Sequence, residues 1–198
     1  PYRRQRQMCI RDRFIGWSKT PDGSVDYRDQ ASVSNLTSEN KAEVTLYAVW
    51  QINQYTITFN SNGGSAVDAV KQDYGTTITK PADPTKTGYT FAGWFKDNNT
   101  FLQEWNFDTD TMPVNGTTIY ANWDLDTYTI TLHDGDSIST VNYDVTMDSV
   151  SLNKPSKEGY TFNGWFEKDS QTEFKYVKGT TVGNKDLYAE WTINQYAI

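Results

Sequence analysis

Short stretches of alternating apolar and polar residues run along the chain, and one of them, an aromatic block, recurs. The block reads Gly-Tyr-Thr-Phe-x-Gly-Trp-Phe at residues 88–95 and again at 159–166, and its Phe-x-Gly-Trp part is found at 14–17. A period of two predicts strands that bury one face. Recurrence at intervals of about 70 to 80 residues indicates an array of similar modules.

The aromatic blocks and the tryptophans that end the closing strands are predicted to form the core. The glycine before each block tryptophan breaks the period of two, which predicts a bulge or a close approach of backbones. The alternative is that a tryptophan stacks on a ligand. The predicted core residues are Tyr89, Phe91, Gly93, Trp94, Trp123, Tyr160, Phe162, Gly164, Trp165 and Trp191.

The repeats divide the chain into modules. We expect residues 14–50 to be the C-terminal part of a truncated repeat, 55–123 and 128–191 to be complete repeats, and 192–198 to start a further one. The linkers 51–54 and 124–127 span at most about 14 Å. Neighbouring repeats in cis are therefore expected nearly to touch, as a semi-stiff string.

Turn residues predict two local features within each module. Asn62-Gly63-Gly64 follows the strand 55–59, and such glycines supply the positive φ of a tight hairpin turn. Residues 83–88 place Asp, Pro and Gly in the order typical of one helical turn. The sequence therefore predicts an α+β fold that is mainly β, with one short helical turn in each module.

The N-terminal residues have a different origin. Residues 3–12 read Arg-Arg-Gln-Arg-Gln-Met-Cys-Ile-Arg-Asp, which matches an in-frame translation of a transposase sequencing adapter. The alternative is a basic arm for nucleic acid or a membrane surface. We interpret residues 1–13 as an adapter translation that is not native, and we leave them out of the fold prediction.

Charge argues against nucleic acid as a partner. The whole chain has a formal net charge of −7. Without residues 1–13 it has 13 basic and 24 acidic residues, a net charge of −11, and an acidic chain repels phosphate backbones. The only cysteine, Cys9, is in the excluded segment, so no disulfide is expected. No apolar run is long enough to span a bilayer.

The combined motifs resemble the Listeria–Bacteroides repeat, also called the B-repeat of internalin B. They are a Tyr-Thr-Ile-Thr-Phe strand, a Gly-Gly turn, Pro-x-x-Pro-Thr-Lys, the aromatic block and a closing Leu-Tyr-Ala-x-Trp. The resemblance implies tandem β-grasp (ubiquitin-like) modules in the extracellular part of large bacterial surface proteins. In the second complete module, Asp134-Gly135-Asp136 replaces the Gly-Gly turn, and the first Pro of Pro-x-x-Pro is absent.

Residues with catalytic or metal-binding chemistry are sparse. The single histidine, His133, precedes Asp134 and could form half of an acid–base pair, although a surface substitution is the simpler interpretation. Asp108/Asp110 and Asp134/Asp136 supply oxygen ligands but lack the order of a calcium loop. We therefore expect no enzyme activity, cofactor or metal.

Two functions outside catalysis are compatible with the sequence. The modules are expected to act at the cell surface as a spacer or stalk in adhesion. The alternative is direct binding of a host protein, a matrix protein or a glycan, through a sheet edge or through exposed aromatic rings. Tyr120 and Tyr188, together with Tyr47, are the candidate ligand contacts, and cross-strand packing is their other possible role.

Overall fold

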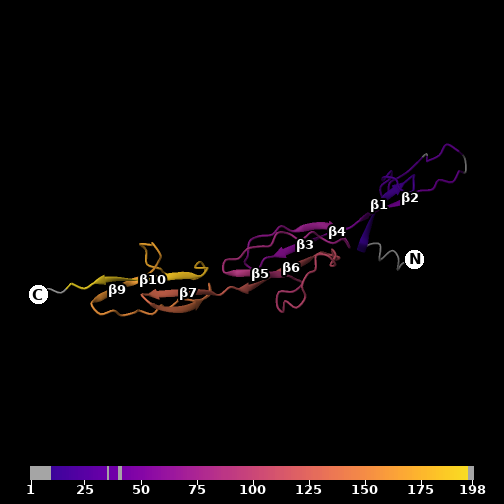
Figure 1. Cartoon of the computed structure of the whole chain (residues 1–198). Coiled ribbons are helices and arrows are strands. Elements are labelled where there is room, and N and C mark those ends of the chain that lie inside the picture. Colours follow the sequence, from indigo (N-terminus) through magenta and orange to yellow (C-terminus); the bar gives the residue numbers. More distant parts are fainter. Residues whose placement is uncertain (1–9, 35, 40–41, 196–198) are drawn as a thin grey trace. The chain divides into compact units, whose positions relative to one another are not determined.

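A computed structural model of the chain describes residues 10–34, 36–39 and 42–195, which are mainly β (Figure 1). One sheet has two strands, β1-β2, and two sheets have four strands each, in the orders β4-β3-β6-β5 and β8-β7-β10-β9. The strands are β1 (Asp12–Ser18), β2 (Tyr47–Ile52), β3 (Gln54–Asn60), β4 (Val70–Asp73), β5 (Tyr89–Phe95), β6 (Thr117–Leu125), β7 (Tyr128–Asp134), β8 (Ser137–Tyr143), β9 (Tyr160–Glu167) and β10 (Lys185–Ile193).

The two-stranded sheet buries little apolar surface. Its antiparallel register shifts between Phe14 and Gly16, and the Phe14 ring contacts Trp17 and Trp50 edge to face. Both tryptophans are 38% exposed, and among the described residues no hydrophobic side chain before Ile57 is buried. Two strands offer no second layer that could cover these rings.

Strand β1 begins inside the segment that we interpret as an adapter translation. Asp12 and Arg13 pair with Ile52 and Gln51, and the Arg13 guanidinium donates to Gln51 Oε1 at 2.6 and 3.1 Å. At the other end, Ile193 closes β10. The last residues of the predicted further repeat, 196–198, lie outside the described residues.

The two four-stranded sheets have the same topology. In each, the first and last strands of the module form a parallel central pair, β3–β6 and β7–β10, and the first also pairs antiparallel with the second strand. Alternation places the side chains of Ile57 and Phe59 on the buried face of the first four-stranded sheet. Its counterpart in the second sheet is a buried cluster of Ile130, Leu132, Tyr143, Trp165 and Leu187.

The prediction of one short helical turn in each module is wrong. Residues 83–88 form no helix, because their backbone bonds go elsewhere: Ser65 N–H donates to Thr85 O at 2.8 Å, and Thr85 N–H donates to Ser65 Oγ at 2.9 Å. The segment ends in a turn in which Tyr89 N–H donates to Lys86 O, with Gly88 at φ 74°. Proline fits this extended path as well as it fits a first helical turn.

The predicted Asn-Gly turn forms, but as part of a long loop between the paired strands β3 and β4 rather than as a tight hairpin turn. Asn62 and Gly63 both have positive φ, and Gly64 N–H donates to Ser61 O. However, β4 starts only at Val70. In the second sheet, Gly135 and Asp136 alone connect β7 to β8, which is the length of a tight hairpin.

The described residues form two compact units. The first contains residues up to Asn60, 66–82 and 94–120; the second contains 61–65, 83–93 and residues from Ala121 onward. The division crosses the first four-stranded sheet. Consequently the linker between β2 and β3 lies within the first unit, and the linker between β6 and β7 lies within the second.

Candidate interaction surfaces

Two of the predicted core tryptophans are buried. Trp94 is 1% exposed and meets the Phe59 ring edge to face at 4.9 Å. Trp165 is 5% exposed, and its indole N–H donates to Asn153 O at 2.8 Å. The glycines before them, Gly93 and Gly164, have φ of 126° and 144°, where a side chain causes strain.

The closing-strand tryptophans of the two four-stranded sheets, Trp123 and Trp191, are half-buried. Trp123 donates its indole N–H to Ser61 O at 2.9 Å and meets the Phe91 ring at 5.5 Å. The Asn-Gly turn covers this ring, since a Cβ at Gly64 would collide with the Trp123 indole. Trp191 meets Phe162 at 5.3 Å.

Tyr89 and Tyr160 begin the aromatic strands at the surface. Tyr89 is half-buried and Tyr160 is 37% exposed. The ammonium groups of Lys86 and Lys157 lie 4.4 and 4.3 Å from the two ring centres, within the range of cation–π attraction.

A linker clamp, which sequence reasoning missed, occurs three times in the part of the chain that the structure describes. The third residue after each closing tryptophan donates its backbone N–H to the carbonyl at the turn before the aromatic strand. Asn53 bonds to Arg11 at 2.7 Å, Asp126 to Gly88 at 3.0 Å and Asn194 to Gly159 at 2.8 Å. An Asn or Asp at the same distance from each tryptophan is the signal that could have identified it.

Asp126 makes two further bonds through its carboxylate. Oδ1 accepts from the Thr90 hydroxyl at 2.7 Å, and Oδ2 accepts from the Tyr128 hydroxyl at 3.2 Å. Burial raises the pKa of Tyr128, and the hydrogen bond to Asp126 raises it further. The linker is therefore attached both to β5 and to β7.

The candidate ligand contact Tyr188 lies on the outer face of the second four-stranded sheet. It is 39% exposed and in register with His133 and Phe166. The His133 ring stacks on Tyr188 with centroids 4.6 Å apart, and its Nε2 lies 3.0 Å from Asp186 Oδ1. His133 thus pairs with Asp186 rather than with its neighbour Asp134.

The equivalent tyrosines have other neighbours. Tyr120 is half-buried and lies opposite Asn60, whereas Tyr47 is 36% exposed and lies opposite Ser18. The structure therefore does not present one uniform tyrosine surface on the three closing strands.

A groove of about 310 Å³ lies beside the core of the second sheet. Its apolar lining includes Phe162, Trp165 and Phe174, with Lys154 and Glu173 among the charged residues. The Asn163 amide, which also lines it, exchanges hydrogen bonds with the Thr192 hydroxyl at 2.9 and 3.1 Å.

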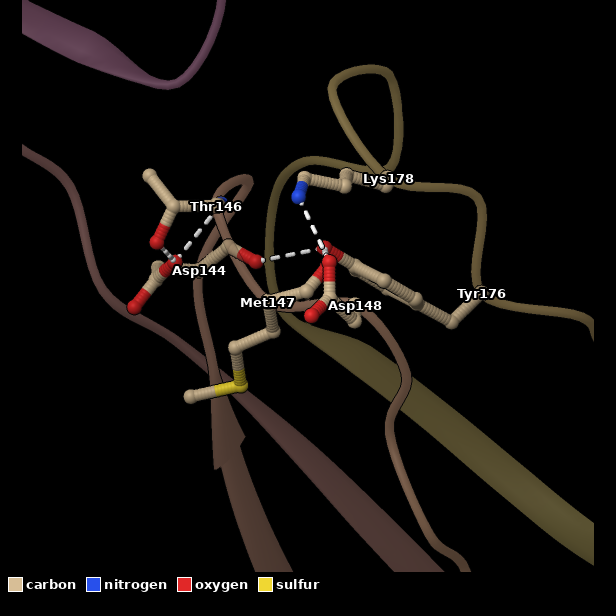
Figure 2. Close-up of polar contacts among 6 residues, drawn as sticks. All are labelled: Asp144, Thr146, Met147, Asp148, Tyr176 and Lys178. Atoms are coloured by element: carbon tan, nitrogen blue, oxygen red, sulfur yellow. Dashed lines mark hydrogen bonds and ion pairs between the residues drawn. The ribbon is translucent and has the colours of Figure 1, made fainter.

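A polar cluster fastens the loop after β8 (Figure 2). The Tyr176 hydroxyl reaches both Asp144 O and Met147 O, at 2.9 and 2.8 Å. Burial raises the pKa of Tyr176. The Thr146 hydroxyl and then its backbone N–H donate to Asp144 and lower the pKa of that carboxyl group.

The acidic pairs do not converge on a metal site in the described part of the chain, where no three His, Cys, Asp or Glu side chains are placed to hold an ion. Asp110 forms an ion pair with Lys96 at 2.8 Å. Burial opposes ionisation of Asp110, but the bonds from Lys96 and from Asn106 N–H outweigh it, so its pKa is lowered.

Within the described residues no helix is long and apolar enough to cross a membrane. The chain is 37% identical over 188 residues to a protein of Evansella cellulosilytica named as a Gly-rich membrane protein, covering 93% of this chain and 21% of the relative. It is 35% identical over 144 residues to Internalin H of Listeria monocytogenes, covering 71% of this chain and 25% of that protein. The chain therefore spans about a quarter or less of the length of these relatives.

The comparison with known families agrees with the repeated topology. Residues 55–122 and 128–190 each match the Listeria-Bacteroides repeat domain. These two stretches hold the two four-stranded sheets of equal strand order. The chain belongs to the Listeria-Bacteroides repeat domain family and carries its repeats in tandem.

Proposed function

We propose that this chain is a non-catalytic segment of a larger bacterial cell-surface protein and acts as an extracellular spacer or stalk in adhesion. One observation carries the proposal. The same sheet topology forms twice in succession, and only Asp126 and Thr127 lie between β6 and β7. Repeat units joined in this way extend a chain in proportion to their number. The relationship to Internalin H supports placement at the cell surface.

Each complete repeat, 55–123 and 128–191, is proposed to be a β-grasp module. Support comes from the strand order, in which the first and last strands are parallel neighbours at the centre and the second and third lie at the edges. The aromatic residues then serve packing. Burial of Trp94 and Trp165 supplies the apolar interior that a domain of this size needs.

The experiment replaces one repeat in the parent protein on the cell surface. Residues 128–191 are deleted, or are exchanged for an unrelated domain of similar length. If the repeat acts as a spacer, its deletion should reduce adhesion and the unrelated domain should restore adhesion. Adhesion that returns only with the original repeat would contradict the spacer function.

Direct ligand binding is the second candidate, and the observation that favours it is the stack of half-buried His133 on Tyr188, which is 39% exposed. The part of the Tyr188 ring that His133 leaves uncovered is a surface that a sugar ring or an aromatic side chain can contact. Binding of the chain to arrays of glycans and of host or matrix proteins tests this, with Tyr188→Ala and Tyr120→Ala as variants. Loss of a signal in a folded Tyr188→Ala chain would support binding, and equal absence of signal in all chains would favour the spacer.

A further inference from the structure

Gly88, at the turn before β5, is covered by a residue of the following repeat. Gly88 is buried, and Val145, in the loop after β8, is 5% exposed. A Cβ at Gly88 would lie 2.9 Å from the Val145 Cβ and closer still to both Val145 methyl groups. Real Cβ atoms do not approach neighbours so closely, so Val145 occupies the space that any side chain at position 88 would need.

The linker residue Asp126 reinforces this contact. Its backbone N–H is bonded to Gly88 O, and its carboxylate joins Thr90 of one repeat to Tyr128 of the next. These residues all belong to the second compact unit. Apolar contact and hydrogen bonds therefore act at the same junction.

We propose that Gly88, Asp126 and Val145 form a joint that restrains two successive repeats, and that the matching surface at Gly159 and Asn194 docks a further repeat of the same kind. The residue equivalent to Val145 in that further repeat would cover Gly159. The biological role of the joint, though not its existence, rests on the spacer function proposed above.

The Gly159 surface repeats the turn geometry of the Gly88 surface and its hydrogen bonds from the linker backbone and from the strand threonine. Gly159 has φ 77° where Gly88 has 74°. Asn194 N–H donates to Gly159 O at 2.8 Å, and the Thr161 hydroxyl donates to Asn194 Oδ1 at 2.6 Å. Apart from Gly159 itself and its two chain neighbours, no described residue has a heavy atom within 4 Å of the position of a Cβ at Gly159.

In the other complete repeat, the residue equivalent to Val145 also lies next to the linker that precedes its repeat. Counted back from the turn glycine, Tyr74 corresponds to Val145. Its backbone N–H donates to O of the linker residue Asn53 at 2.8 Å, and its ring meets Tyr55 edge to face at 6.1 Å. The loop after the second strand is thus the part of a repeat that faces the preceding linker, which identifies the occupant of the Gly159 surface as another repeat.

Gly88→Val and Gly159→Val form a matched pair, because both glycines have similar positive φ, 74° and 77°, and each substitution adds comparable backbone strain. Nitrogen-15 relaxation of the whole chain measures the rotational correlation times of residues 55–122 and 128–190. We expect Gly88→Val to abolish their correlated tumbling and Gly159→Val to leave it unchanged. Equal effects of the two variants would overturn the joint.

A longer chain, in which residues 128–195 are repeated once after residue 195, tests the docking surface. In this longer chain, Gly159→Val should abolish the correlated tumbling of the last two repeats. Unchanged rotational correlation times would overturn the proposal for Gly159. Val145→Ala loosens the Gly88 joint without backbone strain and replaces Gly88→Val if that chain does not fold. Loss of correlated tumbling together with adhesion restored by an unrelated domain of equal length would show that the spacer function stands independently of the joint.

Discussion

The Thr90 hydroxyl, on β5, donates a hydrogen bond of 2.7 Å to Oδ1 of Asp126, which lies in the linker after β6. The same bond occurs between Thr161 and Asn194 at 2.6 Å. A carboxylate and an amide oxygen thus perform the same task at equivalent positions, and only an acceptor oxygen is required.

Asp126→Asn should therefore retain the Thr90 bond and lose the bond from Tyr128, whereas Asp126→Ala loses both and should lower the free energy of unfolding by about 1 kcal/mol for each lost hydrogen bond. Urea unfolding followed by tryptophan fluorescence measures the difference. Asn194→Ala provides the matched change in the following repeat. Equal stabilities of Asp126→Asn and Asp126→Ala would contradict the role assigned to the acceptor oxygen.

Gly164→Ala should destabilise the second sheet by roughly 1–3 kcal/mol, the range for a strained backbone position. Gly164 has φ 144°, and a Cβ there would lie 2.8 Å from Glu173 Oε1. The double variant with Glu173→Ala removes the collision but not the strain, so it should recover part of the loss. No recovery in thermal or urea unfolding would show that the backbone alone determines the cost.

Tyr143→Phe should lower the free energy of unfolding by about 1 kcal/mol. Tyr143 is fully buried, and its hydroxyl donates to Gly183 O at 2.5 Å, so the substitution leaves a carbonyl without its donor. Tyr188→Phe, at an exposed position, is the control and should be close to neutral. A neutral Tyr143→Phe would mean that water replaces the lost donor.

Alternation in the sequence was sufficient to predict β3 and its inner face, because alternation and burial share one period. Ile57 and Phe59 are two residues apart and both point inward. The sequence was not sufficient for residues 83–88, where Asp, Pro and Gly suit a helical turn and an extended segment equally. Ser65 decides between them by bonding to Thr85, twenty residues later in the chain.

The same limit applies to the surfaces. His133 could be assigned Asp134 as a partner only from adjacency, whereas the parallel register of β7 and β10 places Tyr188 beside His133 and brings Asp186 to Nε2. The cover on Gly88 depends on a contact with Val145. Both are contacts between residues more than fifty positions apart, and local pattern does not encode such contacts.

Acid should weaken the loop after β8. Hydrogen bonds from the Thr146 hydroxyl and backbone lower the pKa of Asp144, so the folded state holds the ionised carboxylate more firmly than the unfolded chain does. This stability is present above the ordinary Asp pKa and is lost as pH falls through the lowered value. Asp144→Asn should reduce the dependence of the urea midpoint on pH below about 4. An unchanged acid profile would contradict this assignment.

Base should weaken the second sheet through its tyrosines. The pKa values of Tyr128, Tyr143 and Tyr176 are raised, in each case first by burial. The unfolded chain therefore loses these protons at lower pH than the folded chain, and stability is full below the ordinary Tyr pKa of about 10 and declines as pH rises above it. Urea midpoints between pH 8 and 11.5 should fall more steeply for the native chain than for the Tyr143→Phe variant, which shares its lysines. Parallel profiles would show that lysine deprotonation, rather than the buried phenol, causes the decline.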